Sequence, residues 1–137
     1  MKAEAVIFDR LSTFAGVTDL IGTNPARVWP VALPQDPAYP CLSYRRIESR
    51  RVRGVYSDPG YAYATVQVNG FAKTFDELKA LMEQVRLALE RFGSALTGTT
   101  IAGVLVYDIV MGSEADSYEP ALDVYAHAVD FEILHAE

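Results

Sequence analysis

The sequence predicts an α+β domain: a mainly antiparallel sheet of about four to five strands, with one long and one shorter helix packed on one face. Segments with apolar residues at helical spacing alternate along the chain with segments that alternate polar and apolar residues in period two. Short turn sequences separate several of the expected strands, which favours antiparallel pairing. A length of 137 residues with 50% hydrophobic residues is enough for one core, so we expect a single domain over residues 1–137.

The N-terminal segment predicts the shorter helix. Residues 3–14 place Val6, Ile7, Leu11 and Phe14 at helical spacing, and Gly16 follows as a stop signal. Residues 18–21 can add one more turn, and residues 27–29 read as a short strand. Prolines at four positions between 30 and 40 then indicate an extended surface connection.

Two long strands are expected next. Residues 41–47 are strand-like, and residues 61–71 alternate strictly, with small apolar side chains on one side that suit a closely packed helix. Residues 58–60, Asp-Pro-Gly, carry the signature of a type II turn. The pair therefore predicts a long hairpin with the arginine-rich stretch near its tip.

The long helix begins at a capping box, in which the Thr74 hydroxyl accepts from the Glu77 amide. Gly93 is placed to end it. A stripe of large apolar side chains at helical spacing predicts that this helix contributes most to the core: Leu78, Leu81, Met82, Val85, Leu89 and Phe92.

The last third predicts two further strands, at residues 100–110 and 122–134, which are rich in β-branched and aromatic residues. Residues 112–120 between them are polar and acidic, and we expect a loop there.

Composition excludes several classes of protein. No apolar run approaches the length of a membrane span, and the N-terminus lacks a signal-peptide pattern, so we expect a soluble, unexported protein. The single cysteine, Cys41, is expected to be a buried core thiol in a reducing compartment.

Catalytic and metal-binding patterns are also missing from the sequence, and we expect no enzyme activity, cofactor or metal. His127 lies in the middle of an expected strand, where a structural role is the simpler interpretation. Asp108, Asp123 and Asp130 could converge as a carboxylate cluster for a divalent cation, but solvated strand faces and ends explain them more simply.

Residues 45–54 hold five of the twelve basic residues of the chain. If strand pairing continues past Ile47, Arg45, Arg51 and Arg53 point to one face and Arg46 and Arg50 to the other. A DNA-binding groove would need these side chains on one side, and the pI near 4.9 also argues against a nucleic-acid module. A protein contact and a solvated loop both remain good explanations of this stretch.

Charge is separated along the chain, which carries a net charge of −6. No Lys or Arg follows Arg91, whereas acidic residues continue to the C-terminus. A basic middle and an acidic last third can attract each other between copies, so self-association is a hypothesis to keep.

The order of these features resembles a known family. The segments are an N-terminal helix, R-V-W-P, V-A-L-P-Q-D-P-A-Y-P, C-L-S-Y-R-R-I, A-T-V-Q-V-N-G-F-A, T-F-D-E-L-K-A-L and Y-E-P-A-L-D-V-Y-A-H-A-V-D-F-E-I. Together, from about residue 4 to residue 133, they resemble the tail completion, or tail terminator, proteins of long-tailed bacteriophages and prophages.

The resemblance implies a non-enzymatic virion protein, assembled in the bacterial cytoplasm, that forms a ring, usually a hexamer, on the head-proximal end of the tail tube. There it would stop tube polymerisation and join tail tube protein to the head connector or neck. Six copies would carry a net charge of about −36, so DNA would pass through the lumen without specific binding. The alternatives are another neck component, such as a head–tail adaptor or connector stopper, and a small nucleic-acid-binding module.

Within such a ring, charge and position select two sets of contact residues. Head-to-tail closure needs two different complementary patches on each subunit. We expect a basic arm that contacts a neighbouring subunit or the tube, and an opposing acidic loop: Arg50, Arg51 and Arg53 in the arm, and Glu114, Asp116 and Glu119 in the loop.

Overall fold

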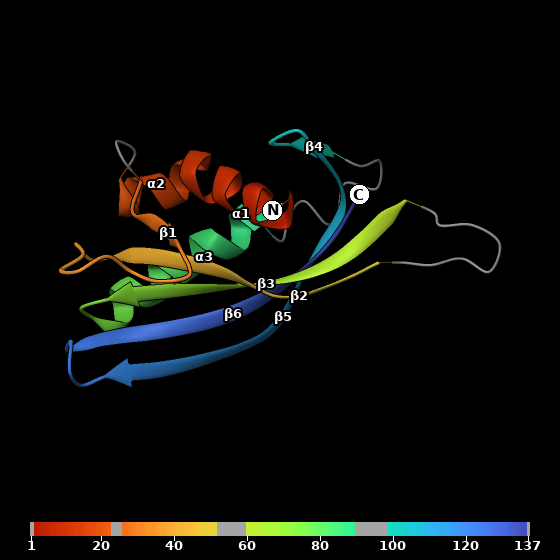
Figure 1. The fold of residues 1–137 in the computed structure, drawn as a ribbon. Helices are drawn as coiled ribbons and strands as arrows, with labels where there is room; N and C mark the ends of the chain where they lie inside the picture. The colour runs from red at the N-terminus through yellow and green to blue at the C-terminus, as the bar shows by residue number, and fades with distance from the viewer. Residues whose placement is uncertain (1, 23–25, 52–59, 90–98, 137) are drawn as a thin grey trace.

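The computed structural model describes residues 2–22, 26–51, 60–89 and 99–136. These residues form three helices and six strands, and the helices lie on one face of a single curled sheet (Figure 1). In chain order the elements are α1 Lys2–Thr13, α2 Ala15–Ile21, β1 Val28–Pro30, β2 Cys41–Arg51, β3 Tyr61–Ala72, α3 Phe75–Leu89, β4 Thr99–Ile101, β5 Val104–Glu119 and β6 Val124–Ala136.

The strand order across the sheet is β1-β2-β3-β6-β5-β4. The β1–β2 pair is parallel and every other pair is antiparallel, so the α+β class and the mainly antiparallel sheet are as expected. The sheet has six strands rather than four to five. The strand expected at residues 100–110 is divided by a tight turn at Ala102 and Gly103, whose φ angles of 52° and 78° suit the primed turns of two-residue hairpins.

The N-terminal region contains two helices, and the predicted stop at Gly16 is wrong. The chain breaks instead at Phe14, which has an extended conformation, and α2 runs through Gly16. A side chain at Gly16 would overlap the Gln84 carboxamide, so this glycine permits α2 to approach α3. Arg10 of α1 donates two hydrogen bonds to the Ala88 carbonyl, at 3.1 and 2.9 Å, and thereby satisfies a carbonyl in the last turn of α3.

Helix α3 begins at the predicted capping box, where the Glu77 amide donates to the Thr74 hydroxyl at 3.2 Å. Its apolar stripe is buried from Leu78 to Leu89. The predicted end at Gly93, and Phe92 with it, lie outside the described residues. The helix covers β3 on its small side: Gly70 lies beneath α3, where a Cβ atom would overlap the Met82 sulfur. The close helix-to-sheet packing expected from the small residues of β3 is therefore confirmed.

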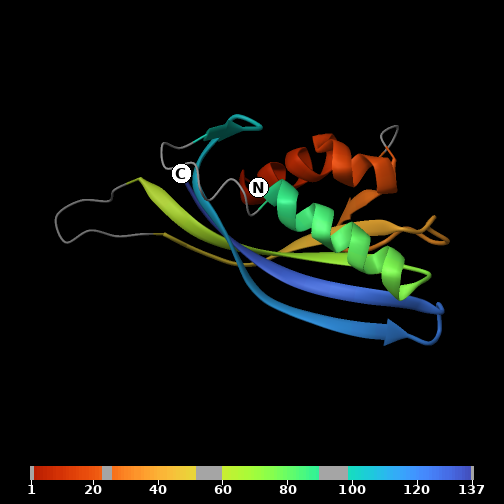
Figure 2. The ribbon, with the colours of Figure 1, turned by 180° about the vertical axis from the view of Figure 1, so that it is seen from behind.

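The sheet is long and strongly bent (Figure 2). At one end β4 and the start of β5 curl toward α1, and Ile101, Val104 and Val106 join the same buried core as Val6 of α1. At that end β2 and β3 extend beyond the helices (Figure 1). Irregularities in β2 and β5 interrupt the regular register, and such bulges increase local twist.

The acidic loop expected at residues 112–120 is wrong. Strand β5 continues through this segment to Glu119 and pairs with β6 from Glu114 opposite Val129 to Glu119 opposite Val124. The segment is polar because β5 lies near the edge of the sheet, where its side chains are exposed to solvent. An edge strand does not need the apolar face that identifies a buried strand.

Candidate functional site

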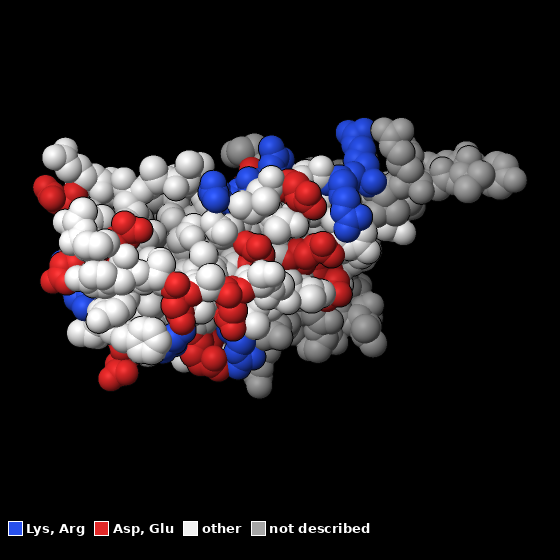
Figure 3. All heavy atoms as spheres, turned by 90° about the horizontal axis from the view of Figure 1, so that it is seen from below, with Lys and Arg blue, Asp and Glu red and all other residues white. Residues whose placement is uncertain are grey.

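The basic stretch forms one edge of the sheet. The part of β2 from residue 45 to residue 51 is exposed throughout, and β1 pairs only with residues 42–44 of β2. Seen from the face that the helices leave uncovered, several Lys and Arg side chains lie along one edge, acidic side chains lie across the middle, and further Lys or Arg atoms are visible at the opposite edge (Figure 3). Arg50 and Arg51 belong to this edge, and Arg53 lies outside the described residues.

The predicted distribution of the arginines over the two faces is wrong, because the register shifts between Arg46 and Glu48. Residues directly opposite each other in an antiparallel pair share a face. Arg45 lies opposite Gln67 and Arg50 opposite Tyr63, so both point away from the helices. Arg46 opposite Val66 and Arg51 opposite Ala62 are on the helix side. The irregularity at Ile47 thus places two arginines on each face.

On the uncovered face the arginines have partners within the chain. The Arg50 guanidinium lies 4.6 Å from the centre of the Tyr63 ring and 3.7 Å from Glu132. Arg45 donates to the Gln67 carboxamide oxygen at 3.2 Å, and Gln67 in turn donates to Asp130 at 3.4 Å. These contacts lie between exposed or half-exposed groups, where water and salt screen them, so each contributes little to stability.

The acidic residues form the opposite edge. Glu114, Asp116 and Glu119 all lie on β5, and they do not share one face. Glu114 and Asp116 are on the helix side, opposite Val129 and His127, and Glu119 opposite Val124 is on the uncovered side. Strand β4 pairs only with residues 104–106 of β5, so this acidic edge begins beyond the short cover that β4 provides.

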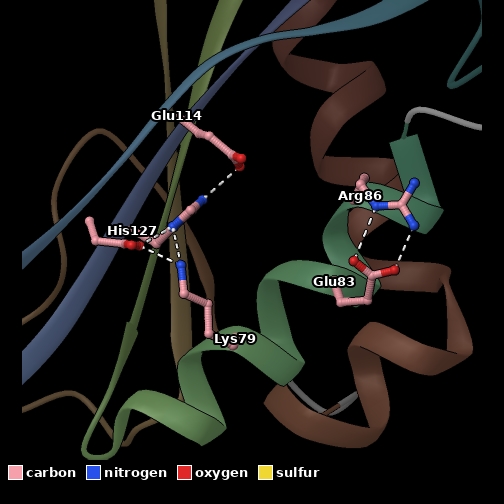
Figure 4. Close-up of polar contacts among 6 residues, drawn as sticks. Lys79, Glu83, Arg86, Glu114 and His127 are labelled. Atoms are coloured by element: carbon pink, nitrogen blue, oxygen red, sulfur yellow. Dashed lines mark hydrogen bonds and ion pairs between the residues drawn. The ribbon is translucent and has the colours of Figure 1, made fainter.

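A polar cluster connects this edge to α3. The buried His127 ring has Nδ1 at 2.5 Å from Asp116 Oδ1 and Nε2 at 3.2 Å from Glu114 Oε2. Lys79 extends from α3 toward His127, and Glu114 approaches the ring from the other side (Figure 4). Lys79 Nζ donates to Asp116 at 2.7 Å, and the hydrogen bonds from Lys79 and then from His127 lower the pKa of Asp116.

A groove lies beside the cluster, between α3 and β5. It encloses about 210 Å³ and has an apolar floor of Met82, Met111, Val129 and Phe131. Charged side chains form the rim: Lys79, Glu83, Arg86, Glu114 and His127. Glu83 and Arg86 pair with each other along α3, at 3.1 and 2.5 Å (Figure 4). Among the described residues that line the groove, none is Ser, Thr or Cys.

The three aspartates considered for a cation lie apart. Asp108 is opposite Leu134, whereas Asp130 faces Gln67 at a different level of the sheet. Asp123 belongs to the β5–β6 turn and accepts a hydrogen bond from the Tyr118 hydroxyl at 2.5 Å. Over the described residues, no group of His, Cys, Asp and Glu side chains is arranged to hold a metal ion. None of the described helices is long and apolar enough to span a membrane.

Sequence reasoning placed His127 in a structural role and missed its partners. The alternation along β6 puts His127 on the helix side, so a polar partner near that position was to be expected. Lys79 could not be recognised, because a lysine on the polar side of an amphipathic helix resembles any solvated residue. The contact between Lys79 of α3 and Asp116 of β5 therefore could not be predicted from the sequence.

The comparison with protein families identifies the chain. The family described as tail completion protein gp17 matches residues 5–136, nearly the whole chain. This chain belongs to that family. The tail completion protein is thus a structural component of a phage tail, as its resemblance to that class predicted.

Solved structures share the fold of this tail completion protein. A chain in a structure described as the virion of a native gene transfer agent (GTA) particle superposes with a TM-score of 0.75 at 14% sequence identity, over 98% of this chain and 94% of that one. A second solved structure gives a TM-score of 0.57 at 18% identity, over 98% and 93% of the two chains. No protein with a curated description matches the sequence.

Proposed function

We propose that this tail completion protein assembles as a closed ring, a hexamer, on the head-proximal end of a phage tail tube. The ring ends polymerisation of the tube and presents the surface that joins tail to head connector. Its partners are tail tube protein on one side and a connector or neck protein on the other. Membership of the tail completion family supports this proposal, and one feature of the molecule carries the ring: its two sheet edges have opposite charge.

Opposite charge on opposite edges suits a head-to-tail contact. A ring forms when each subunit presents two different patches, one of which binds the other patch of the next subunit. In the proposed ring, the arm with Arg50, Arg51 and Arg53 of one subunit contacts the acidic strand of the next. Glu114, Asp116 and Glu119 provide the facing carboxylates.

The present partners of these side chains do not prevent such a contact. Arg50 and Glu132 are 3.7 Å apart, with 59% and 44% of their side chains exposed, and a pair of this kind contributes little. Exchange of such a partner for one in a neighbouring subunit costs little, and complementary charges across the interface set the register and favour this partner over others.

The net charge of −6 per chain supports a lumen that DNA crosses without specific binding. On the uncovered sheet face, Arg45 and Arg50 are accompanied by the acidic side chains of Asp130 and Glu132. An alternating surface of this kind favours contact with protein over contact with a polyphosphate backbone.

Solution mass tests the ring directly. We expect light scattering to show a shift from monomer to hexamer as concentration rises, with weaker assembly at high ionic strength. The triple variant Arg50→Glu, Arg51→Glu, Arg53→Glu should remain folded and monomeric. Lys73→Glu is the matched control for Arg50→Glu, because each cation stacks on a tyrosine ring, Lys73 on Tyr39 at 5.0 Å and Arg50 on Tyr63. Arg50→Glu should weaken assembly. Lys73→Glu should not, because Lys73 follows the opposite end of β3, away from the basic edge.

Addition of purified components tests the position in the virion. Rings should bind one end of assembled tail tubes and limit their length, and unlimited tube growth in the presence of rings would overturn the capping role. Copurification with portal protein rather than with tubes would assign the chain to another position in the neck. A steep salt-dependent affinity for DNA would favour the nucleic-acid module instead.

A further inference from the structure

Among the described residues, two strand edges of the sheet have no neighbouring strand along most of their length. In the part of the chain that the structure describes, β4 covers only residues 104–106 of β5, and β1 covers only residues 42–44 of β2. The outer edges of β5 at residues 107–119 and of β2 at residues 45–51 therefore present backbone donors and acceptors to their surroundings. Such edges are templates for an additional strand.

The strand directions allow these two edges to meet between copies. Strand β2 is antiparallel to β3, β3 to β6, and β6 to β5, so β2 and β5 run in opposite directions within one sheet. If the sheet of one copy continues into the sheet of the next, β5 lies beside the neighbouring β2 in an antiparallel arrangement. This is the arrangement that ladder hydrogen bonds require.

The charges then match on both faces of the joined sheet. On the helix side, β2 carries Arg46 and Arg51, and β5 carries Glu114 and Asp116. On the uncovered side, β2 carries two arginines and β5 carries two carboxylates: Arg45, Arg50, Asp108 and Glu119. The sequence places no Lys or Arg between residues 107 and 119 to oppose an arginine-rich strand.

The groove between α3 and β5 fits the side chains of such a strand. An arginine on the helix side of an added strand would lie beside Glu114, with its methylene groups over the apolar floor formed by Met82 and Met111. The rim cations are already engaged, Arg86 by Glu83 and Lys79 by Asp116. Glu114 contacts His127 at 3.2 Å and keeps 53% of its side chain exposed, so it can also accept from an added arginine.

We propose that residues 45–51 of one copy add as an antiparallel strand to the edge of β5, residues 107–119, in the next copy. This inference rests on the proposed ring and specifies its contact: backbone ladder bonds provide the join, and the charges select the partner strand. Carboxylates on β5 also repel a second β5 edge, so they disfavour wrong pairing while they accept the basic strand.

A peptide with the sequence of residues 44–52 tests the strand addition on the full-length protein. The triple variant Arg50→Glu, Arg51→Glu, Arg53→Glu serves as receptor. Its own β2 strand carries carboxylates that the acidic β5 edge repels, so it does not compete with the peptide, and β5 is unchanged. Fluorescence anisotropy should show binding of the labelled peptide. Two matched control peptides have the same side chains. One is N-methylated at the odd-numbered residues and the other at the even-numbered residues. Methylation removes backbone donors and leaves the charge unaltered.

We expect one of the two N-methylated peptides to bind about tenfold or more weakly than the unmodified peptide, because it loses ladder hydrogen bonds. Substitution of Glu114→Gln in the receptor should weaken all three peptides alike. Equal binding of both methylated peptides and the unmodified one would overturn strand addition and leave a purely electrostatic contact.

Light scattering distinguishes a failure of the β2–β5 contact from a failure of the proposed ring. Hexamers of the wild-type protein without peptide binding to the variant would preserve the ring and overturn the β2–β5 contact. Peptide binding to a wild-type protein that stays monomeric, with or without tail tubes, would preserve the strand-binding edge and overturn the ring.

Discussion

The substitution Gly70→Ala tests how closely α3 packs on the sheet. A Cβ atom at Gly70 would overlap the Met82 sulfur and lie 3.4 Å from Leu78 Cδ1 and 3.5 Å from Leu42 Cδ2. Leu42 and Leu78 are fully buried, so the added methyl group has no empty space to enter. Either the Met82 side chain leaves its position or α3 moves outward.

Overpacking of this kind costs about 1–3 kcal/mol. Alanine also reduces the backbone freedom of the unfolded chain, which offsets roughly 0.4–1 kcal/mol of this cost. We therefore expect the free energy of unfolding to fall by about 1–2 kcal/mol, which for a domain of this size lowers the melting temperature by roughly 3–8 °C.

Urea denaturation followed by circular dichroism measures the change, with all variants at one protein concentration because assembly would add apparent stability. Gly112→Ala is the matched control in β5, where a Cβ atom would meet its nearest neighbour, the Asp130 carbonyl oxygen, at 3.4 Å. It should be neutral or slightly stabilising. The reasoning fails if the two variants are equally stable.

The double variant Gly70→Ala, Met82→Ala isolates the contact itself. Truncation of Met82 removes the atom that the new methyl group displaces. The double variant should therefore be more stable than the sum of the two single effects predicts, by about 1–2 kcal/mol. Additive effects would show that the cost of Gly70→Ala arises elsewhere.

Three further predictions concern the core and the polar cluster. Burial raises the pKa of the Cys41 thiol to about 12, with a smaller opposing effect of Arg27, so a disulfide reagent should label it only after unfolding. Asp116, with a pKa lowered mainly by Lys79, stabilises the fold above its unfolded pKa and loses that effect as the pH falls through its folded pKa. Asp116→Asn should therefore cost no more than about 1 kcal/mol at neutral pH, and chemical denaturation should show the difference shrinking below about pH 4. Phe131→Ala should lower the free energy of unfolding by about 3–5 kcal/mol, measured in the same way, because Phe131 is fully buried.

Local patterns predicted the elements whose signals lie within a few residues. Helix α3 follows from Thr74 and Glu77 and from a buried stripe, and the β2–β3 hairpin follows from strict alternation. The predictions failed where a strand is exposed to solvent, because its side chains then do not alternate between polar and apolar residues. The polar part of β5 was expected to be a loop, because an exposed edge strand needs few apolar residues.

The role of the candidate contact residues stays a prediction. The basic and acidic groups were recognised from charge, and the register then distributed each group over both faces of its strand. The irregularity at Ile47, which reverses the faces of Arg50 and Arg51, has no signature in the sequence, because it arises from pairing with β3.

By itself, the sequence determined the class of fold, the long helix, the hairpin and the separation of charge, since each depends on spacing along the chain. Only the tertiary structure decided that β3 pairs with β6, which makes β2 and β5 the two long edges of one sheet. It also brought Lys79 to His127 and formed the groove beside β5. These relations join residues that are distant in sequence, and packing between distant segments leaves no periodic pattern in either of them.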